Sequence, residues 1–292
     1  KTNDSKKEIK SIVIRRRSAH GDVLIASGVA SALKNKYPKS KIIFSTDCPE
    51  VLEKNPFIDK IVEIHSERWF DLYFDLDMAY EYRPNCNILQ AYAEACGVNV
   101  DNCEIYLHSL NFENLPEKYV VIHSGKTMWA GRNWSTIKFD QIANKLKLSG
   151  FKVVVIGTLS DHKTSVCDID LRGLTNIGEL SYVIKKSKLF IGIDSFPMHV
   201  AQVLKIPGVC FFGSINPETR LLKNSSITEV FAEDLKCIGC HHRKSTPCTA
   251  TINCEIGIQD CINNVTVDKM WRSIQKILDV DNHGGFVYEK KI

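Results

Sequence analysis

One carboxylate stands where a predicted strand turns into a helix. Asp22 follows Gly21 a few residues after the apolar run Ser11–Arg15. In this position Asp22 could cap the helix, a role that contributes ~1 kcal/mol, or could take the proton of an acceptor hydroxyl as a general base. The two roles are compatible, and the residues alone leave both open.

A second stretch is typical of a loop that holds an anion. Ser124, Gly125 and Lys126 directly follow the apolar run 119–123, and Arg132 lies a few residues further on. Backbone N–H groups at a helix start face an anion, and Lys or Arg neutralises its charge. This combination suits a diphosphate, whereas each cation taken singly is more typical of a solvated surface.

A third stretch repeats this arrangement after another apolar run. Asp194, Ser195 and His199 follow the run 189–193 and open a helix. They form either a helix cap with a packed histidine or a set that holds phosphate or ribose. Gly213 ends the next apolar run, and we expect it to line the same cleft.

The densest group of cysteines lies near the end of the chain. Cys237 and Cys240 form a Cys-x2-Cys pair, and Cys254 and Cys261 follow. Four thiolates suit a tetrahedral zinc or iron site, whereas the alternative is a cysteine-rich loop without metal. Cys248 is a fifth thiol, and the predicted set leaves it out.

Alternating strands and helices position these stretches. In the first half, short apolar runs rich in β-branched residues predict strands, and 3.6-residue periodicity predicts helices. The predicted strands are 11–15, 41–44, 61–64 and 72–75, and the predicted helices are 23–37 and 87–96. Around residues 114–117 the pattern breaks.

The same cycle then starts again. The second half has predicted strands 119–123, 152–157, 189–193 and 209–212, with helices 135–149, 178–187 and 198–204 and a closing helix 267–278. This predicts two doubly wound parallel sheets whose strand ends face a cleft. The expected domains are 1–116 and 117–280, the second with a cysteine-rich segment 237–261, followed by a tail 281–292.

Composition excludes several classes of protein. The 292 residues are 44% hydrophobic and 25% charged, and the formal net charge of +4 is too weak to indicate nucleic-acid binding by itself. The run Arg15-Arg16-Arg17 is locally basic, and we interpret it as a solvated loop or strand end. No apolar run could span a bilayer. Lys1–Lys10 does not have the pattern of a secretory signal, so the cytoplasm is the expected compartment.

Motifs of other α/β enzymes are missing from the chain. No Gly-x-Gly-x-x-Gly follows a strand, which argues against a dinucleotide-dependent dehydrogenase. There is also no Walker A sequence and no Gly-x-Ser-x-Gly.

Several motifs in order resemble glycosyltransferase family 9, the heptosyltransferases. They run from about residue 11 to 280. Gly21-Asp22-Val-Leu resembles the family's opening signature and Asn55-Pro-Phe-Ile-Asp59 its second motif. Arg132-Asn-Trp134 resembles a Lys/Arg-x-Trp element. Asp194-Ser-Phe-Pro-Met-His199 resembles an Asp-Thr/Ser-Gly-x-x-His element, and Phe212-Gly213-x-x-x-Pro217 follows it. Phe196 stands where the family usually has glycine.

The resemblance implies a GT-B fold and an inverting sugar transfer. The C-terminal domain would bind a nucleotide-diphosphate sugar, with an ADP-sugar favoured, and the N-terminal domain would bind a glycan or lipid-linked acceptor. Asp22 would be the general base, and Arg132, Asp194, Ser195 and His199 would contact the donor. The transfer would need no metal at the phosphates. The cysteine-rich segment resembles one that holds iron in certain family members.

Two other functions remain open. The same chemistry could act on a protein or on a modified DNA base, for which Arg15–Arg17 would supply a basic face. A non-catalytic protein that only binds a nucleotide sugar is the other alternative.

No transmembrane segment is expected in this chain, although peripheral contact with a membrane would suit a lipid-linked acceptor.

Overall fold

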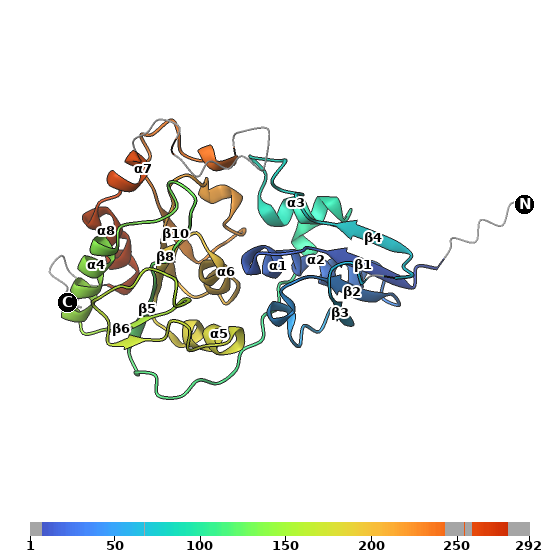
Figure 1. Ribbon diagram of the computed structural model, residues 1–292, viewed down its shortest axis with the longest axis horizontal. Coiled ribbons are helices and arrows are strands. Elements are labelled where there is room, and N and C mark those ends of the chain that lie inside the picture. The colour runs from blue at the N-terminus through green and yellow to red at the C-terminus, as the bar shows by residue number, and fades with distance from the viewer. Residues whose placement is uncertain (1–7, 67, 243–253, 255–258, 280–292) are drawn as a thin grey trace, which may run out of the picture. The chain divides into compact units, whose positions relative to one another are not determined.

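The chain forms two compact units, Lys1–His108 and Ser109–Ile292, each built around one parallel sheet (Figure 1). This computed structural model describes residues 8–66, 68–242, 254 and 259–279. Leu110 donates its backbone N–H to the Gly178 carbonyl and so belongs with the second unit. The functional boundary after residue 116 stays a prediction, and the predicted tail and Cys248 lie outside the described residues.

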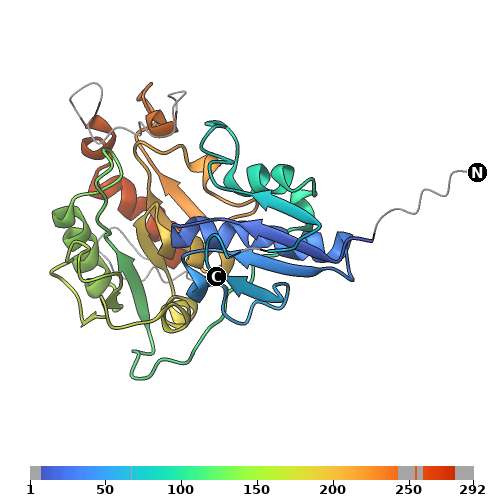
Figure 2. The same cartoon turned by 45° about the vertical axis from the view of Figure 1, so that its right-hand side comes forward.

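The first unit contains a four-stranded parallel sheet in the order β3-β2-β1-β4. Its strands are β1 (Ser11–Arg15), β2 (Lys41–Ser45), β3 (Lys60–Val62) and β4 (Leu72–Asp75), drawn in blue to cyan in Figure 2. All four predicted strands are therefore confirmed. The chain continues from β1 to β2 on one side and returns to β4 on the other. This reversal makes the carboxyl ends of β1 and β4 a topological switch point.

The helix predicted over 23–37 is two helices. Helix α1 (His20–Ala26) and helix α2 (Gly28–Lys36) meet at Ser27, whose hydroxyl donates to the Leu24 carbonyl at 2.7 Å. A side chain at Gly28 would lie 2.8 Å from Ile105 Cγ1, so α2 packs closely at this point. The unit is completed by α3 (Ile88–Ala95) and the 3₁₀ turns η1 (Pro49–Leu52) and η2 (Val100–Asn102).

The second unit contains a six-stranded parallel sheet in the order β10-β9-β8-β5-β6-β7. The strands are β5 (Tyr119–His123), β6 (Lys152–Val155), β7 (Ile169–Asp170), β8 (Phe190–Ile193), β9 (Gly208–Phe211) and β10 (Ile227–Val230). The order is that of a doubly wound Rossmann sheet, with its switch point between β5 and β8. The sequence analysis missed β7 and β10, because β7 has two residues and β10 carries two exposed residues at its centre.

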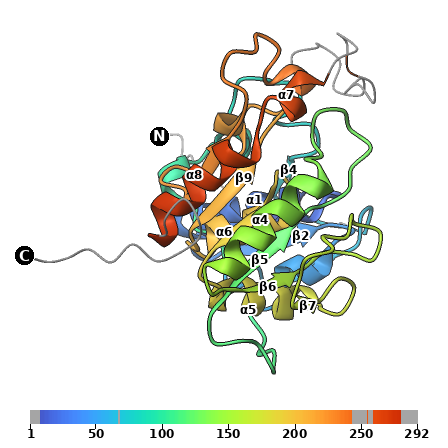
Figure 3. The same ribbon diagram turned by 90° about the vertical axis from the view of Figure 1, so that its left-hand side faces the viewer.

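Helices cover both faces of this second sheet. Helices α4 (Thr136–Leu148) and α8 (Val267–Leu278) pack together on one face (Figure 3). Helices α5 (Ile177–Lys186) and α6 (Phe196–Val203) lie on the other. The remaining elements are α7 (Asp260–Asn263) and the turns η3 (Pro217–Thr219) and η4 (Cys240–His242). The buried core includes Trp134, whose ring meets that of Phe139 edge-on at 5.0 Å.

The helices of the described residues are too short or too polar to span a membrane.

Candidate active site

Each sheet places polar side chains at its topological switch point. In the second unit, His123 is the last residue of β5, and Asp194 and Ser195 directly follow β8, its neighbour in the sheet. Ligands of doubly wound sheets bind outside the carboxyl ends of the strands at such a point. The fold therefore brings the second and third stretches of the sequence analysis to one location.

Asp194 is the centre of a buried charge cluster. Arg132 donates from Nη2 to Asp194 Oδ2 at 2.8 Å and to the Asp194 carbonyl at 3.0 Å. Burial by itself raises the pKa of Asp194, but Arg132, Arg220 and His199 lower it below its usual range. The carboxyl group is therefore ionised at neutral pH. Two guanidinium groups face this one carboxylate, which leaves an excess of positive charge at the switch point.

His199 is a packed histidine that also lies beside Asp194. Its side chain is buried, and its Nδ1 lies 2.7 Å from Gln202 Nε2. Gln202 Oε1 in turn accepts the Leu222 N–H at 2.9 Å. Because the amide nitrogen of Gln202 can only donate, this geometry assigns the acceptor role to His199 Nδ1. A packed histidine and a ligand-contacting histidine, the two interpretations of His199 from the sequence, are thus compatible.

Three residues of the loop after β5, Ser124, Gly125 and Lys126, were predicted to contact the donor, and the first two are held by close contacts within the protein. Ser124 is buried, and its hydroxyl donates to the His162 carbonyl at 2.5 Å. Gly125 has a φ of 60°, and a side chain there would overlap with Ile193. Lys126 is exposed, so of the three it alone extends its side chain into solvent.

Ser195 precedes α6 but does not cap it with its side chain. Its hydroxyl lies 3.0 Å from His123 Nδ1 and 3.1 Å from the Ile193 carbonyl. On the other side of the imidazole, His123 Nε2 lies 3.5 Å from Asp161 Oδ2. Serine, imidazole and carboxylate therefore form a continuous chain across β8, β5 and the loop after β6.

The start of α6 offers fewer N–H groups than the predicted anion site requires. Pro197 has no N–H, and those of Met198 and His199 bond to the Ser195 carbonyl at 3.1 and 3.3 Å. The hydroxyl of Ser195 is therefore the more important polar group of this turn.

Gly213 packs against the loop that carries Arg132. A side chain at Gly213 would overlap with the Gly131 carbonyl, and Ser214 donates its N–H to the same carbonyl at 3.1 Å. The glycine thus permits close approach of two loops at the site.

In the first unit, Asp22 is held by a buried arginine. Arg16 donates from Nη2 to Asp22 Oδ2 at 2.7 Å and to Glu81 Oε1 at 2.8 Å, and the Tyr80 hydroxyl lies 3.4 Å from both Asp22 oxygens. Helix α1 begins at His20 with Ala19 as its N-cap, so the interpretation of Asp22 as the helix cap is wrong. The Asp22 side chain is 16% exposed and can still be reached by solvent or ligand.

The interpretation of Arg15–Arg17 as a solvated basic run is wrong at Arg16. Its guanidinium is 7% exposed and packs against the rings of Tyr80 and Tyr92. Burial lowers the pKa of Arg16, but Tyr92, Asp22 and Glu81 together raise it above its usual value. The flanking arginines form ion pairs of 3.2–3.5 Å with aspartates, namely Asp75, Asp77 and Asp47. The run is therefore largely neutralised.

The four predicted metal ligands come together. Burial, together with contributions from Cys240, Cys237 and Cys254, raises the pKa of the Cys261 thiol to about 11, so the four thiols lie in one neighbourhood. Four sulfurs around a tetrahedral ion would lie roughly 3.8 Å apart, given metal–sulfur bonds of about 2.3 Å. Within the described residues, no three of these sulfurs lie within 4.8 Å of one another. Four thiolate ligands suit zinc or iron chemically, and the sulfurs would have to move closer together to bind the ion.

The cysteine-rich segment also touches the loops that carry Gly131 and Ser214. A side chain at Gly131 would lie 3.1 Å from Cys261 Sγ, and His241 donates its N–H to the Ser214 carbonyl at 3.0 Å. Burial, together with the charges of Arg132 and Arg220, lowers the pKa of the His241 imidazole to about 4.

Another group of metal-ligand atoms lies in the first unit. Among the described residues, atoms of His20, Cys48 and Glu50 lie within 4.8 Å of one another. His20 Nε2 and Glu50 Oε1 are 2.7 Å apart as a surface ion pair, with both side chains more than 40% exposed. This ion pair explains why the three groups lie together, so they need no metal ion to account for it.

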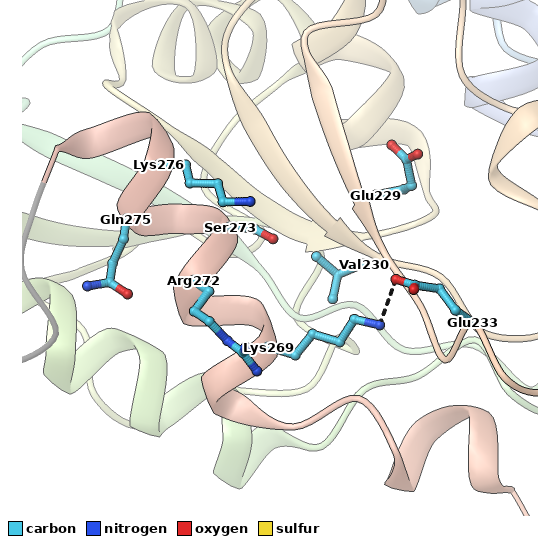
Figure 4. A pocket seen from close by; sticks show the side chains of 8 residues that line it. All are labelled: Glu229, Val230, Glu233, Lys269, Arg272, Ser273, Gln275 and Lys276. Carbon is cyan, nitrogen blue, oxygen red and sulfur yellow. Dashed lines mark hydrogen bonds and ion pairs between the residues drawn. The ribbon is translucent and has the colours of Figure 1, made fainter.

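The groove in Figure 4 lies away from these loops, between β10 and α8. It encloses about 760 Å³ and is lined by charged side chains, among them Glu229, Lys269 and Arg272. Lys269 and Glu233 form an ion pair of 2.9 Å within it. None of its lining residues belongs to the predicted site.

Comparison with known proteins identifies the family. Residues 65–249 match the model of glycosyltransferase family 9 (heptosyltransferase). The chain belongs to this family. The family's members are glycosyltransferases, and the matched range contains the Arg132 and Asp194 loops.

Solved structures share the fold at low sequence identity. The iron-containing dodecameric glycosyltransferase TibC of enterotoxigenic E. coli H10407 is 16% identical, with a TM-score of 0.76 over 93% of this chain and 76% of TibC. A family 9 glycosyltransferase of Veillonella parvula is 17% identical, with a TM-score of 0.74 over 92% of this chain and 97% of that protein. These similarities confirm the predicted α/β fold of the GT-B type.

Similarity to curated proteins is more local. Lipopolysaccharide heptosyltransferase 3 of E. coli K12 is 33% identical over 92 residues, which is 28% of this chain. The match spans only 27% of that relative's length.

The sequence analysis missed several residues of both clusters. Arg16 was assigned to a solvated run, and His123 was noted only as the end of a strand. Asp161, Arg220 and His241 carried no local signal, because they come from loops far from Asp194 and Ser195 in the chain. The position of His123 at the switch-point edge was the one indication that could have singled it out.

Proposed function

We propose that this chain is an inverting glycosyltransferase that transfers a heptose or related sugar from an ADP-sugar to a hydroxyl of a lipopolysaccharide core glycan. Membership of family 9 supports a sugar transfer. The observation that carries the proposal is the buried Arg132–Asp194 pair beside Ser195, at the switch point between β5 and β8.

The second unit would hold the donor. Arg132 and Arg220 both face Asp194, which suits the binding of an anion, and the exposed Lys126 adds a cation in the loop after β5. Ser195 would donate a hydrogen bond to the diphosphate. TibC is described in complex with ADP-D-β-D-heptose, and over 93% of this chain the two folds agree with a TM-score of 0.75. An ADP-heptose is therefore the first donor to test.

The first unit would hold the acceptor, with Asp22 as the general base. Asp22 takes the proton of the acceptor hydroxyl as the oxygen of that hydroxyl attacks the anomeric carbon of the donor. The new glycosidic bond forms on the face opposite the diphosphate, the old carbon–oxygen bond breaks, and ADP leaves with the bonding electrons. Arg16 keeps the Asp22 carboxylate oriented, with one oxygen engaged at 2.7 Å.

A glycan acceptor has the stronger support. The curated relatives that match part of this chain are lipopolysaccharide heptosyltransferases. A DNA acceptor would need an unpaired basic face, whereas Arg15 and Arg17 are paired with aspartates. We place the reaction in the cytoplasm, where nucleotide sugars are made.

Cys237, Cys240, Cys254 and Cys261 would hold one zinc or iron ion. Their convergence on Cys261 and the chemistry of four thiols suit such an ion. When bound, the ion would order the segment that packs against Gly131. The proposed transfer takes no step through this metal.

A transfer assay tests the proposal directly. We expect the purified protein to release ADP from ADP-heptose when a heptose-deficient lipopolysaccharide core is present, and mass spectrometry of the core should show one added heptose. Binding of ADP without transfer to any core glycan would contradict the proposed activity and leave a nucleotide-sugar-binding protein.

A further inference from the structure

His123 is buried at the centre of the second sheet and is enclosed on both sides. It is 5% exposed. A side chain at Gly125 would lie 3.2 Å from its Cε1, and one at Gly157 would lie 3.1 Å from its Cδ2. Both glycines have positive φ angles, 60° and 132°, which favour glycine. The imidazole is therefore held in one orientation by backbone on two sides.

The two ring nitrogens of His123 face two different partners. Nδ1 lies 3.0 Å from the Ser195 hydroxyl, and Nε2 lies 3.5 Å from Asp161 Oδ2. Asp161 is itself fixed, because its Oδ2 accepts the Thr158 N–H at 2.6 Å. Burial raises the pKa of Asp161, but the hydrogen bonds from His123 and Thr158 lower it to about 2. At neutral pH this carboxylate accepts hydrogen bonds only, so Nε2 of His123 carries a proton.

Hydrogen-bond polarity then determines what Ser195 can do. A serine hydroxyl has one proton and can donate one hydrogen bond. Without ligand, that proton can go to His123 Nδ1 or to the Ile193 carbonyl, at 3.0 and 3.1 Å. A diphosphate oxygen has only lone pairs, so Ser195 must turn its proton toward the ligand. Nδ1 can then keep its contact with Ser195 only as an N–H donor.

We propose that binding of the donor diphosphate at Ser195 is coupled to uptake of a proton by His123. The proton comes from solvent and binds to Nδ1, which gives an imidazolium that donates to Ser195 and to Asp161. His123 is thus a positioning residue: it orients the Ser195 proton toward the diphosphate and adds a positive charge behind it. The inference rests on the proposed function, because it requires a diphosphate at this switch point.

The loops that meet at His123 carry further charged groups. Asp161 contacts the imidazole, and the loops after β5, β6 and β8 also carry Lys126, His162 and Asp194. Arg132 and Arg220 face Asp194, and Arg172 contacts Asp161. Arg172 donates to the Asp161 carbonyl at 2.8 Å and pairs with Asp170. Asp161 and Asp194 are ionised at neutral pH, and the arginines keep their charge throughout the tested range. His162 is the other histidine in this set, so a His162→Gln variant serves as the control.

Calorimetric titration of the full chain with ADP tests the coupling. Titrations at one pH in buffers of different ionisation enthalpy give the number of protons taken up on binding. The terminal phosphate of ADP also exchanges a proton near neutrality, so each titration is repeated with an ADP-sugar, whose diphosphate is esterified at both ends and has no such proton. We expect wild-type protein to take up more protons than Ser195→Ala, His123→Gln and Asp161→Asn, and His162→Gln to match wild type. If binding takes up one proton, the affinity for ADP should also fall by up to about tenfold for each unit by which the pH rises.

The Ser195→Ala variant separates the relay from simple charge attraction. It keeps His123 and Asp161 but lacks the hydroxyl, so an unchanged proton uptake in this variant would overturn the inference. Ser195→Thr restores a hydroxyl and should restore the uptake, which a role in packing alone would not explain. Thermal melting of each variant shows which are folded. If His123→Gln does not fold, the proton uptake of Ser195→Ala and Asp161→Asn tests the inference. A wild-type protein that does not bind ADP would refute the proposed function, and this inference with it.

Discussion

The two sheets carry charge clusters of opposite sign at equivalent places. In the first unit, at the switch point between β1 and β4, the single cation Arg16 faces Asp22 and Glu81. In the second unit, at the switch point between β5 and β8, Arg132 and Arg220 face Asp194, while the other carboxylate there, Asp161, is paired with His123. The first cluster has two carboxylates around one cation, and the second has two cations around Asp194.

This difference indicates how similar sheets are adapted to different roles. A carboxylate in excess can take a proton from a hydroxyl group, which suits a general base. A guanidinium in excess can neutralise a diphosphate and the charge that develops on it as a leaving group. The topology provides the location in both units, and the charge of each cluster is the basis for the role that we propose for it. The predictions below alter one cluster at a time.

Removing the proposed base should have the largest effect. We expect Asp22→Asn to lower turnover by roughly 10²–10⁴-fold, the contribution of a positioned general base. ADP affinity should not change, because the altered residue lies in the first unit. Steady-state rates and calorimetry measure the two effects. Glu81→Gln is the matched control: it removes the other partner of Arg16 and should have a smaller effect on turnover. Equal effects of the two substitutions would argue against Asp22 as the base.

Removing a cation from the second cluster should affect binding instead. We expect Arg132→Ala to weaken ADP binding by about 10–100-fold, since hydrogen bonds to charged groups contribute ~1.5–3 kcal/mol. It also leaves Asp194 buried with one guanidinium fewer, so thermal stability should fall as well. Lys126→Ala removes an exposed cation from the same site and should change affinity by only about twofold to fivefold. Unaltered ADP affinity in Arg132→Ala would exclude it from the donor site.

Disrupting the cysteine cluster should influence the second unit only. Cys237→Ser should lower metal content, measured by elemental analysis of protein purified without chelator. It should also weaken ADP binding by about tenfold or less, because the segment packs against Gly131 beside Arg132. Cys86→Ser, a partly buried thiol of the first unit, should retain the metal. Full metal content in Cys237→Ser would contradict the proposed ligand set.

The smallest expected effect concerns stability in acid. The pKa of Asp161 is about 2 in the folded protein, below the value of roughly 3.9 in an unfolded chain. A lowered folded-state pKa stabilises the protein above the unfolded value, and this contribution is lost as pH falls from about 4 through about 2. It amounts to roughly 1–2 kcal/mol. Chemical denaturation between pH 5 and pH 2 should therefore show a shallower loss of stability in Asp161→Asn. Parallel curves would mean that Asp161 contributes nothing in this range.

Much of the fold was determined by local sequence patterns. Runs such as Tyr119–His123 have an apolar centre because strands of a covered parallel sheet are buried on both faces, and this pattern is visible without a structure. The same holds for the amphipathic closing helix 267–278. Short elements carried too little pattern: β7 has two residues, and the break between α1 and α2 is the single residue Ser27.

The site residues with a local signal were those that follow a strand directly or lie in the first turn of the helix after it. Asp22, Ser124, Asp194 and Ser195 could be selected because the carboxyl ends of parallel strands meet at one edge of a sheet. Only the tertiary structure decided their partners. Arg16 faces Asp22 rather than solvent because two tyrosine rings enclose it. Asp161 reaches His123 from a different loop, and the cysteine-rich segment lies against Gly131. A charge or hydrogen-bond partner depends on distance in space, which residue types and local spacing do not encode.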